Sequence, residues 1–476
     1  MNNFNSQKNP NIVREKSSKK SWKFWIVFWS LATMILVGWF MFLKYKNSGW
    51  IGIANFLSPV LKIAPIDNKQ KDELQSVFKI ASILSKKEDT QTFLILFQNN
   101  LELRPGGGFI GSFGILKIKK GQVIEIDVHD TNIFDDRIAT GIIPPYPMPE
   151  TLSIKDWEMR DSNWSPDFPE NAKKAIELYK LEGGGEDFNG VIALSTELLS
   201  SFLESVGPVT IDGFPGEYNS ENAIEKLEYQ VEKGYWEQKI EKGQRKYIMK
   251  YLAKEILSKV EKMSLSEKKD LLLKLEEHFD QKDIMINFFD DKMQKEITDL
   301  NWDGEVIANF SDDYLMFIDA NLAAYKTDLK MIRSFKYQVD FSGAKPIAKL
   351  DLTYTNTAKV KDWMTNNYQS YLRIYTPQES WLLDSDSPRQ IKFGEEFNKK
   401  YFGTLIQVPL GATRTFHFEY SLPERITFEN YNLMIQKQSG VSEVEGEIKL
   451  IDENKKTKEY KVTAVQDWEL KTSQSK

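Results

Sequence analysis

The fold is decided by residues 90–130, which read TQTFLILFQNNLELRPGGGFIGSFGILKIKKGQVIEIDVHD. The stretch begins with an apolar run, Phe93–Phe97, and continues through a polar cluster into three consecutive glycines. Two further apolar runs follow, Phe109–Leu116 and Val123–Val128. Short apolar runs bounded by turn residues predict three strands, with the first at the centre of a sheet. The polar segments that follow these strands are where chemistry is expected.

Beyond this stretch, strands alternate with helices and then give way to strands alone. Helices are predicted at 169–181, 195–206, 220–233, 244–262, 265–279 and 290–300, with short strands at 190–194, 209–211 and 283–289. This alternation predicts an α/β domain, residues 91–330, with a mixed sheet, flanking helices and a helical insertion. From Arg333 on, short alternating strands predict an all-β sandwich over residues 331–470.

One hydrophobic segment predicts the location of the protein. Phe24–Leu43 carries no charge, and its length of about 20 residues matches a bilayer core. Six Lys/Arg precede this segment and only Lys44 and Lys46 follow it closely, which places the N-terminus in the cytoplasm and the bulk of the chain outside. We therefore expect a disordered cytoplasmic tail at 1–21, a single transmembrane helix at 22–45 and a juxtamembrane helical segment at 46–90. The alternative is a cleaved signal peptide, against which the length of the run argues.

Charge and cysteine content exclude several classes of function. Setting aside the 8 basic and 1 acidic residues up to Lys46, the totals of 63 and 69 leave 55 Lys/Arg and 68 Asp/Glu, a net charge of −13. An acidic exterior argues against nucleic acid as a partner. The absence of cysteine from the sequence excludes disulfides and Cys-based metal or nucleophilic sites.

The polar cluster after the first strand is the principal candidate site. Its side chains are Asn99, Asn100, Glu102 and Arg104, and the glycines Gly106 and Gly107 follow. Glycine amides and a guanidinium together can hold a phosphate. The alternative is a purely local role, in which Asn and Gly permit a turn and Glu102 pairs with Arg104 or caps backbone donors.

A long irregular segment follows the third strand and is rich in carboxylates. Asp130 begins it, and Asp161 and Asn163 lie near its end. Mg²⁺ binds one or two carboxylates together with phosphate oxygens, so Asp130 is the candidate metal ligand. Solvated acidic residues are the alternative interpretation. The three histidines, His129, His278 and His417, have no zinc-ligand spacing.

Several motifs resemble an uncharacterised bacterial membrane-anchored family, the domain of unknown function DUF4012. They are Asn99–Ser112 (NNLELRPGGGFIGS), Ser165–Pro169, Asn189–Leu194, Gly207–Val209, Trp302–Gly304, Tyr371–Pro377 and Gln436–Gly440. The resemblance implies a membrane-anchored protein of this architecture. It implies no particular chemistry.

The order of elements is more distantly similar to the LytR-CpsA-Psr family, which moves glycopolymers from polyprenyl pyrophosphate onto peptidoglycan. His129-Asp130-Thr131 corresponds to that family's Arg-Asp-Thr, and Gln244-Arg245 to its Arg-Gln helix start. The chain departs from the pattern at His129 and Asn100, which replace an arginine and an acid.

This second resemblance implies a membrane-anchored envelope transferase. Arg104 and Arg245 would grip a pyrophosphate, and Asp130 would hold Mg²⁺ or accept the acceptor's proton. The bilayer and a polyprenyl-pyrophosphate glycan or peptidoglycan would be its partners. The alternative is a noncatalytic envelope protein that binds a glycan, lipid or protein.

Overall fold

A computed structural model describes residues 68–472. The chain divides into two compact units, residues 1–85 and 86–476. The predicted tail and transmembrane helix and most of the juxtamembrane segment lie outside the described residues. Between residues 68 and 472, no helix combines the length and apolar character needed to cross a membrane. The first described element is helix α3, Asn68–Lys86, on which the sequence pattern predicts an apolar stripe.

A five-stranded sheet in the order β3-β2-β1-β4-β7 forms the centre of the α/β domain. Its strands are β1 Gln91–Asn99, β2 Phe109–Lys119, β3 Gln122–Asp130, β4 Gly190–Ser195 and β7 Ile284–Phe288. Strand β1 is central as predicted, and it pairs antiparallel with β2 and parallel with β4. The apolar run Phe93–Phe97 therefore has a hydrogen-bonded neighbouring strand on each side.

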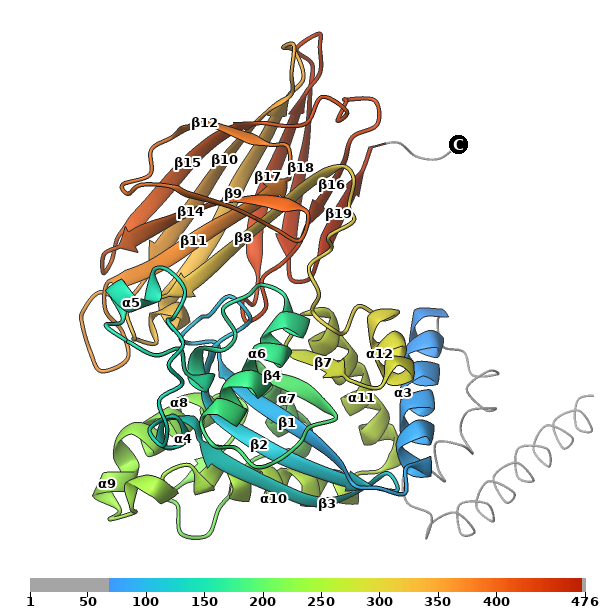
Figure 1. Ribbon diagram of the computed structural model, residues 1–476, viewed down its shortest axis with the longest axis vertical. Coiled ribbons are helices and arrows are strands. Elements are labelled where there is room, and N and C mark those ends of the chain that lie inside the picture. The colour runs from blue at the N-terminus through green and yellow to red at the C-terminus, as the bar shows by residue number, and fades with distance from the viewer. Residues whose placement is uncertain (1–67, 473–476) are drawn as a thin grey trace, which may run out of the picture. The chain divides into compact units, whose positions relative to one another are not determined.

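Side chains alternate between the two faces of this sheet. On β1, Leu94 and Leu96 join the core beneath helix α6, Phe168–Leu181. Ile95 and Phe97 point to the opposite face, where helices α7, Glu197–Val206, and α10, Tyr247–Lys262, cover the sheet. Figure 1 shows helices on both faces, as an α/β fold requires.

Local signals set where the helices begin. The side chain of Asp167 caps α6, and Pro169 occupies its first turn. Ser264 and Glu267 form the predicted capping box of α11, Leu265–Asp280. The remaining elements of this domain are α4 Thr131–Asp135, α5 Met148–Thr151, η2 Met159–Asp161, β5 Val209–Thr210, β6 Glu217–Tyr218, α8 Ala223–Tyr229, η3 Gln230–Gly234, α9 Tyr235–Glu237, η4 Lys242–Gln244 and α12 Asp291–Thr298.

Two six-stranded sheets form the predicted sandwich, in the orders β12-β15-β10-β9-β17-β18 and β13-β14-β11-β8-β16-β19. Its strands are β8 Asp313–Asn321, β9 Met331–Asp340, β10 Ile347–Asn356, β11 Tyr368–Pro377, β12 Trp381–Ser385, β13 Lys392–Glu396, β14 Lys399–Val408, β15 Thr413–Ser421, β16 Asn432–Ile435, β17 Val444–Ile451, β18 Thr457–Ala464 and β19 Trp468–Lys471, with η5 Thr327–Lys330 after β8. The alternating residues predicted on β10 and β15 pair in register and face the core. The sandwich begins with β8, so the boundary predicted at residue 331 falls after its first strand.

Candidate functional site

The predicted site residues divide between two separate places. Arg104 lies in the first, and Asp130 with Arg245 in the second. Arg104 is only 2% exposed, and its guanidinium bonds to both neighbouring carboxylates and backbone carbonyls. Nε donates to Asp161 at 3.0 Å, Nη2 to Glu102 at 2.9 Å and Nη1 to the carbonyl of Asn321 at 2.8 Å. Burial and these bonds hold the guanidinium inside the protein, so the predicted gripping role is corrected to a structural one.

The glycine loop beside Arg104 is packed and does not open onto a ligand. A methyl group at Gly106 would lie 2.2 Å from Asn171 Nδ2, and one at Gly107 would lie 2.0 Å from Gln98 Oε1. Asn163 fixes the loop from the other side, because its Nδ2 donates to the carbonyl of Gly108 at 2.7 Å. Its own carbonyl accepts from the amide of Gly106 at 3.0 Å. The predicted phosphate approach at these glycines is therefore filled by protein atoms.

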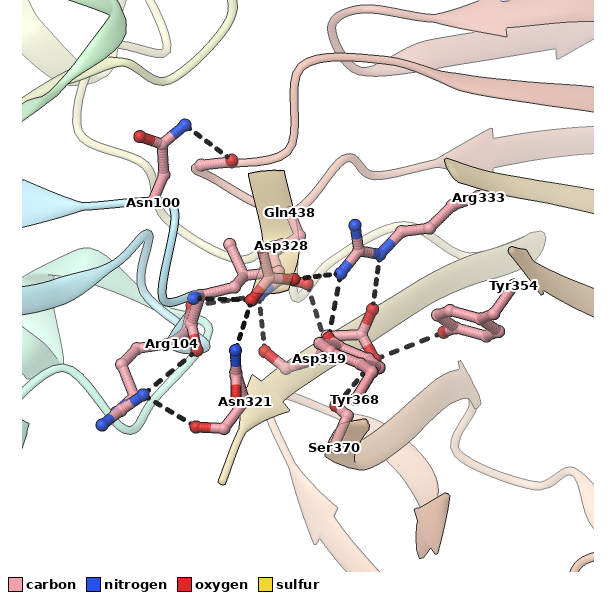
Figure 2. Close-up of polar contacts among 12 residues, drawn as sticks. Asn100, Arg104, Asp319, Asn321, Asp328, Arg333, Tyr354, Tyr368, Ser370 and Gln438 are labelled. Carbon is pink, nitrogen blue, oxygen red and sulfur yellow. Dashed lines mark hydrogen bonds and ion pairs between the residues drawn. The ribbon is translucent and has the colours of Figure 1, made fainter. Parts of the chain in front are cut away.

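The sandwich supplies the atoms that close this loop. Figure 2 shows Gln438 between the loop and strand β8. Its Nε2 donates to the carbonyl oxygens of Arg104, at 3.0 Å, and Asp319, at 2.8 Å. Asn100 Nδ2 donates to the carbonyl of Gly440 at 3.2 Å. Two motifs quoted from the sequence, Asn99–Ser112 and Gln436–Gly440, thus meet in one joint between the domains.

A buried ionic cluster continues the joint into the sandwich (Figure 2). Arg333 pairs with Asp319 at 2.8 Å and with Asp328 at 2.5 Å. Asp328 also accepts from the backbone amide of Leu103 at 3.0 Å. Buried charges are tolerated when they are paired and hydrogen-bonded in this way. We call the contacts of Arg104, Asp319, Asp328, Arg333 and Gln438 the interdomain joint.

The second place holds a charged cluster at the end of β3. Arg245 Nε donates to Asp130 Oδ2 at 2.7 Å, and Lys246 Nζ lies 3.2 Å from Asp130 Oδ1. Lys246 Nζ also contacts the carbonyl of Gly111 on β2. Asp130 caps helix α4 through the amide of Asn132. Thus Asp130, Arg245 and Lys246 lie together, apart from Arg104.

Burial and pairing set the charge states in this cluster. Burial acts to raise the pKa of Asp130, but the hydrogen bond from Arg245 and the charge of Lys246 bring that pKa below its ordinary value. Burial lowers the pKa of Lys246, against the opposing pull of Asp130. Arg245 uses Nε for its hydrogen bond to Asp130, and its Nη1 lies 3.6 Å from Glu232, beyond hydrogen-bonding distance. Arg245 is 7% exposed and forms an ion pair with Glu232 through Nη1, while its Nη groups are donors of the type that binds anions.

His129 lies on the opposite face of the sheet from Asp130. Consecutive strand residues point to opposite faces, and His129 stacks on Phe113, at 4.9 Å, in the core beneath α6. Burial lowers the pKa of His129. His129 therefore does not take the place of the arginine that the distant resemblance assigns to this position.

An apolar cavity of about 360 Å³ adjoins the charged cluster. It lies between the sheet and helices α7, α8 and α10. Its apolar lining comes from all four elements: Ile95, Phe97, Val128, Leu198, Leu199, Phe202, Ile224, Leu227, Val231, Met249, Leu252, Ala253, Ile256 and Leu257. The polar residues Lys246, Asn132 and Glu232 line it as well. This volume falls within the range of about 300–1,000 Å³ that is usual for ligand pockets.

Asn99 belongs to the wall of this cavity, unlike the other residues of the predicted polar cluster. Its Nδ2 donates to Glu228 at 2.8 Å, and Glu228 pairs with Lys326 at 3.2 Å. Burial raises the pKa of Glu228. These three side chains form a second polar patch in an otherwise apolar lining.

The arrangement fits the predicted magnesium poorly. Both oxygens of Asp130 already face cationic groups, Arg245 and Lys246. Across residues 68–472, no three His, Cys, Asp or Glu side chains gather as they would around a metal ion. We therefore derive no step through a metal at Asp130.

Lys246 and the apolar lining are the site features that sequence reasoning missed. Lys246 directly follows Arg245, and α10 carries apolar residues at helical spacing. That spacing is typical of any helix packed on a sheet, so it could not distinguish a filled core from a cavity.

Comparison with known proteins identifies part of the chain. Residues 88–231 match the family described as a protein of unknown function, DUF4012, which confirms that resemblance. No curated protein matches the chain. The resemblance to the LytR-CpsA-Psr family stays a prediction.

Two solved structures show limited similarity. The Lin1025 protein of Listeria innocua is 12% identical, with a TM-score of 0.26, over 46% of this chain and 80% of that chain. The protein gbs0355 of Streptococcus agalactiae is 12% identical, with a TM-score of 0.30, over 46% of this chain and 76% of that chain. Because these TM-scores are low, we draw no conclusion about this protein from either similarity.

Proposed function

We propose that this protein is a membrane-anchored, extracytoplasmic envelope protein whose α/β domain binds a polyprenyl-phosphate lipid. The supporting observation is the apolar cavity that Lys246 lines at one end, where its ammonium pairs with Asp130, which in turn pairs with Arg245. The isoprenoid chain would occupy the cavity, and the phosphate or pyrophosphate would face Arg245. A pocket that is mostly apolar and has the ammonium of Lys246 at one end matches an anionic amphiphile.

The dimensions of the cavity support a chain-like ligand. Its lining runs along α10 from Lys246 to Leu257, a distance of roughly 16 Å at about 1.5 Å per helical residue. Lys246 marks the polar end. Leu257, which is 51% exposed, marks the apolar end. The ligand therefore would lie with its head group near Asp130 and its tail toward the end of α10.

The apolar end of the cavity also supports contact with a membrane. Helix α10 runs antiparallel to β3, because Lys246 meets Asp130 while Lys250 meets Asp127. Leu257 therefore lies toward the start of β3, where Val123 and Ile124 are exposed. The apolar residues at this end could dip into a bilayer interface, from which a lipid chain would enter.

The proposed reaction is attack of a cell-wall hydroxyl on the glycan-bearing phosphorus of a polyprenyl pyrophosphate, which breaks the P–O–P bond, releases polyprenyl phosphate and passes the hydroxyl proton to water. Such chemistry depends on charge stabilisation and positioning, which Arg245 can supply. Asp130 would be a positioning residue, because both its oxygens hold cations and its lowered pKa makes it a weak base. The lowered pKa of Asp130 also favours the second candidate, a noncatalytic protein that binds the lipid without transferring the attached glycan.

Binding of undecaprenyl pyrophosphate to the full chain, purified in detergent and measured by native mass spectrometry, tests the proposal. Arg245→Ala is expected to weaken binding by at least about tenfold, or 1.4 kcal/mol. Ala253→Trp would fill the cavity and abolish binding of the long chain. Arg389→Ala, which changes an exposed arginine of the sandwich, is the matched control. An absence of saturable binding would overturn the proposal.

A transfer assay then separates the two candidates. Wild-type protein is incubated with a lipid-linked glycan and peptidoglycan, and the glycan that becomes covalently attached is counted. Attachment that is lost in Arg245→Ala supports the transferase. Lipid binding without attachment supports the noncatalytic protein.

A further inference from the structure

A second cavity, of about 790 Å³, lies between the α/β domain and the sandwich. One wall is formed by the segment before α6 and by α6 itself, and the other by strands β11, β13 and β14. Its lining includes Ser165 and Arg373, which belong to two motifs quoted from the sequence, Ser165–Pro169 and Tyr371–Pro377. The apolar cavity between the sheet and helices α7, α8 and α10 shares no lining residue with it. It therefore needs an explanation of its own.

Aromatic rings form much of its wall. Trp164 stacks on Tyr371 with centroids 6.2 Å apart and planes within 8°. Tyr146 meets Tyr371 edge-on at 5.6 Å and is 41% exposed. Trp157 and Tyr401 also line the cavity. Aromatic residues gathered from both domains around one hollow offer flat apolar faces beside polar rims.

Two buried donors without partners belong to residues that line this cavity. Arg373 is 4% exposed, and its Nη2 donates to the carbonyl of Trp164 at 2.8 Å. Its Nε, and the hydroxyl of Ser162, have no hydrogen-bond partner in the described part of the chain. Both residues line the cavity. Buried polar atoms are normally satisfied, so these two fit a ligand that brings oxygen atoms.

The charges around the cavity favour an anionic ligand. Lys173 and Lys392 line it, are exposed and make no ion pair within residues 68–472. Lys392 Nζ lies 5.4 Å from the Tyr146 ring. The three carboxylates of the lining already accept from neighbours: Glu177 from Lys174, Glu396 from Tyr375 and Glu170 from Ser165. Lys174 forms an ion pair with Glu177, and Arg373 Nη1 lies 3.5 Å from Glu396. Lys173 and Lys392 then outnumber Glu170, so the remaining charge of the lining is positive.

We propose that this cavity binds an oligosaccharide that carries carboxylate groups. Sugar rings present C–H faces that pack on aromatic rings, and their hydroxyls would meet Ser162 and the wall carboxylates. A carboxylate would reach Arg373 or the two lysines through charge-assisted hydrogen bonds. A lipid chain is disfavoured, because charged side chains line this cavity. The proposal stands independently of lipid binding by the α/β domain.

Isothermal titration of the full chain in nanodiscs with two tetrasaccharides tests this assignment. The anionic probe is a hyaluronan tetrasaccharide, and the neutral probe of equal length is chitotetraose. We expect hyaluronan to bind at least about tenfold more tightly, in line with one or two charge-assisted hydrogen bonds. Tyr146→Ala and Lys392→Ala change exposed side chains, so both variants should fold, and each should weaken binding severalfold.

Trp381→Ala is the matched control, because Trp381 is 68% exposed on the sandwich and does not line the cavity. It should leave the affinity unchanged. The assignment is overturned if neither tetrasaccharide binds, if chitotetraose binds as tightly as hyaluronan, or if Tyr146→Ala and Lys392→Ala both leave binding intact. Undecaprenyl pyrophosphate binding should be unaffected by these variants, so the two proposals fail separately.

Discussion

Gln438 and Asp319 form two hydrogen bonds with each other. In both, the side-chain amide of Gln438 bonds to the backbone of Asp319, as the backbone of a neighbouring strand would. The backbone amide of Asp319 donates to Gln438 Oε1 at 2.8 Å, and Gln438 Nε2 donates to the carbonyl of Asp319 at 2.8 Å. The same Nε2 reaches the carbonyl of Arg104. One side chain therefore satisfies backbone groups of both domains in a buried position.

Gln438→Leu is expected to destabilise the protein strongly. The change removes the partner of the buried Asp319 amide and a donor from two buried carbonyls, of which that of Arg104 keeps the amide of Gly107. Each buried group left unsatisfied costs about 1–3 kcal/mol. We expect the free energy of unfolding, measured in urea, to fall by about 3 kcal/mol or more. Gln407→Leu, at a position exposed on the same sandwich, is the control and should change it little. Equal effects would contradict this account of the joint.

Removal of the charge should mainly affect protein stability at Arg104 and mainly affect lipid binding at Arg245. Arg104→Met leaves Asp161 and Glu102 buried without their cation, which typically costs about 3–5 kcal/mol. Arg245→Met should lower stability much less, because Asp130 keeps Lys246. Urea unfolding and undecaprenyl pyrophosphate binding are measured for both variants. Selective loss of lipid binding in Arg104→Met, with stability unchanged, would restore the gripping role for Arg104.

The glycine loop should tolerate no side chain. A methyl group at Gly108 would lie 2.3 Å from the backbone carbon of Asn99, whereas one at Gly185 would meet nothing within 4 Å. Gly108→Ala is therefore expected to lower the melting temperature by several degrees, in keeping with overpacking costs of about 1–3 kcal/mol. Gly185→Ala should be neutral. A melting temperature unchanged in Gly108→Ala would show that the loop is open to ligands.

Asp135 and Glu182 predict how stability varies with pH. Burial, followed by the charge of Glu182, raises the pKa of Asp135 to about 9. Asp135 Oδ1 and Glu182 Oε2 are buried and have no donor among the described residues, so a proton held between them satisfies both. From roughly pH 4 to about 9, the folded state keeps a proton that the unfolded state has released. Stability therefore falls as pH rises, by up to about 1.4 kcal/mol per unit.

The variant Asp135→Asn separates this effect from the rest of the protein. Its amide can donate to Glu182 without a titrating proton, so the pH dependence of the unfolding free energy between pH 5 and 8 should become flatter. Asp136→Asn, at the exposed neighbouring residue, should keep the wild-type slope. If Asp135→Asn also keeps that slope, the shared proton is absent.

Local signals predicted most of the elements, and long-range contacts decided the site. The apolar run Phe93–Phe97 and the Ser264–Glu267 capping box act over a few residues, and both are found as predicted. Arg104 could not be placed in this way, because its partners Asp161 and Asn321 lie 57 and 217 residues away. An arginine beside glycines looks the same in sequence whether it meets a ligand or a buried carboxylate. The cavities were equally hidden, since their linings are assembled from several elements.

The interdomain joint also constrains when the protein can finish folding. Arg104 and Gln438 are separated by 334 residues. At about 5–20 residues per second, a ribosome needs roughly 20–70 s to make the chain between them. Throughout that interval the loop after β1 lacks the partners that close it. The domain made first is therefore completed last, and a nascent chain stalled before residue 438 would leave that loop exposed to chaperones and proteases.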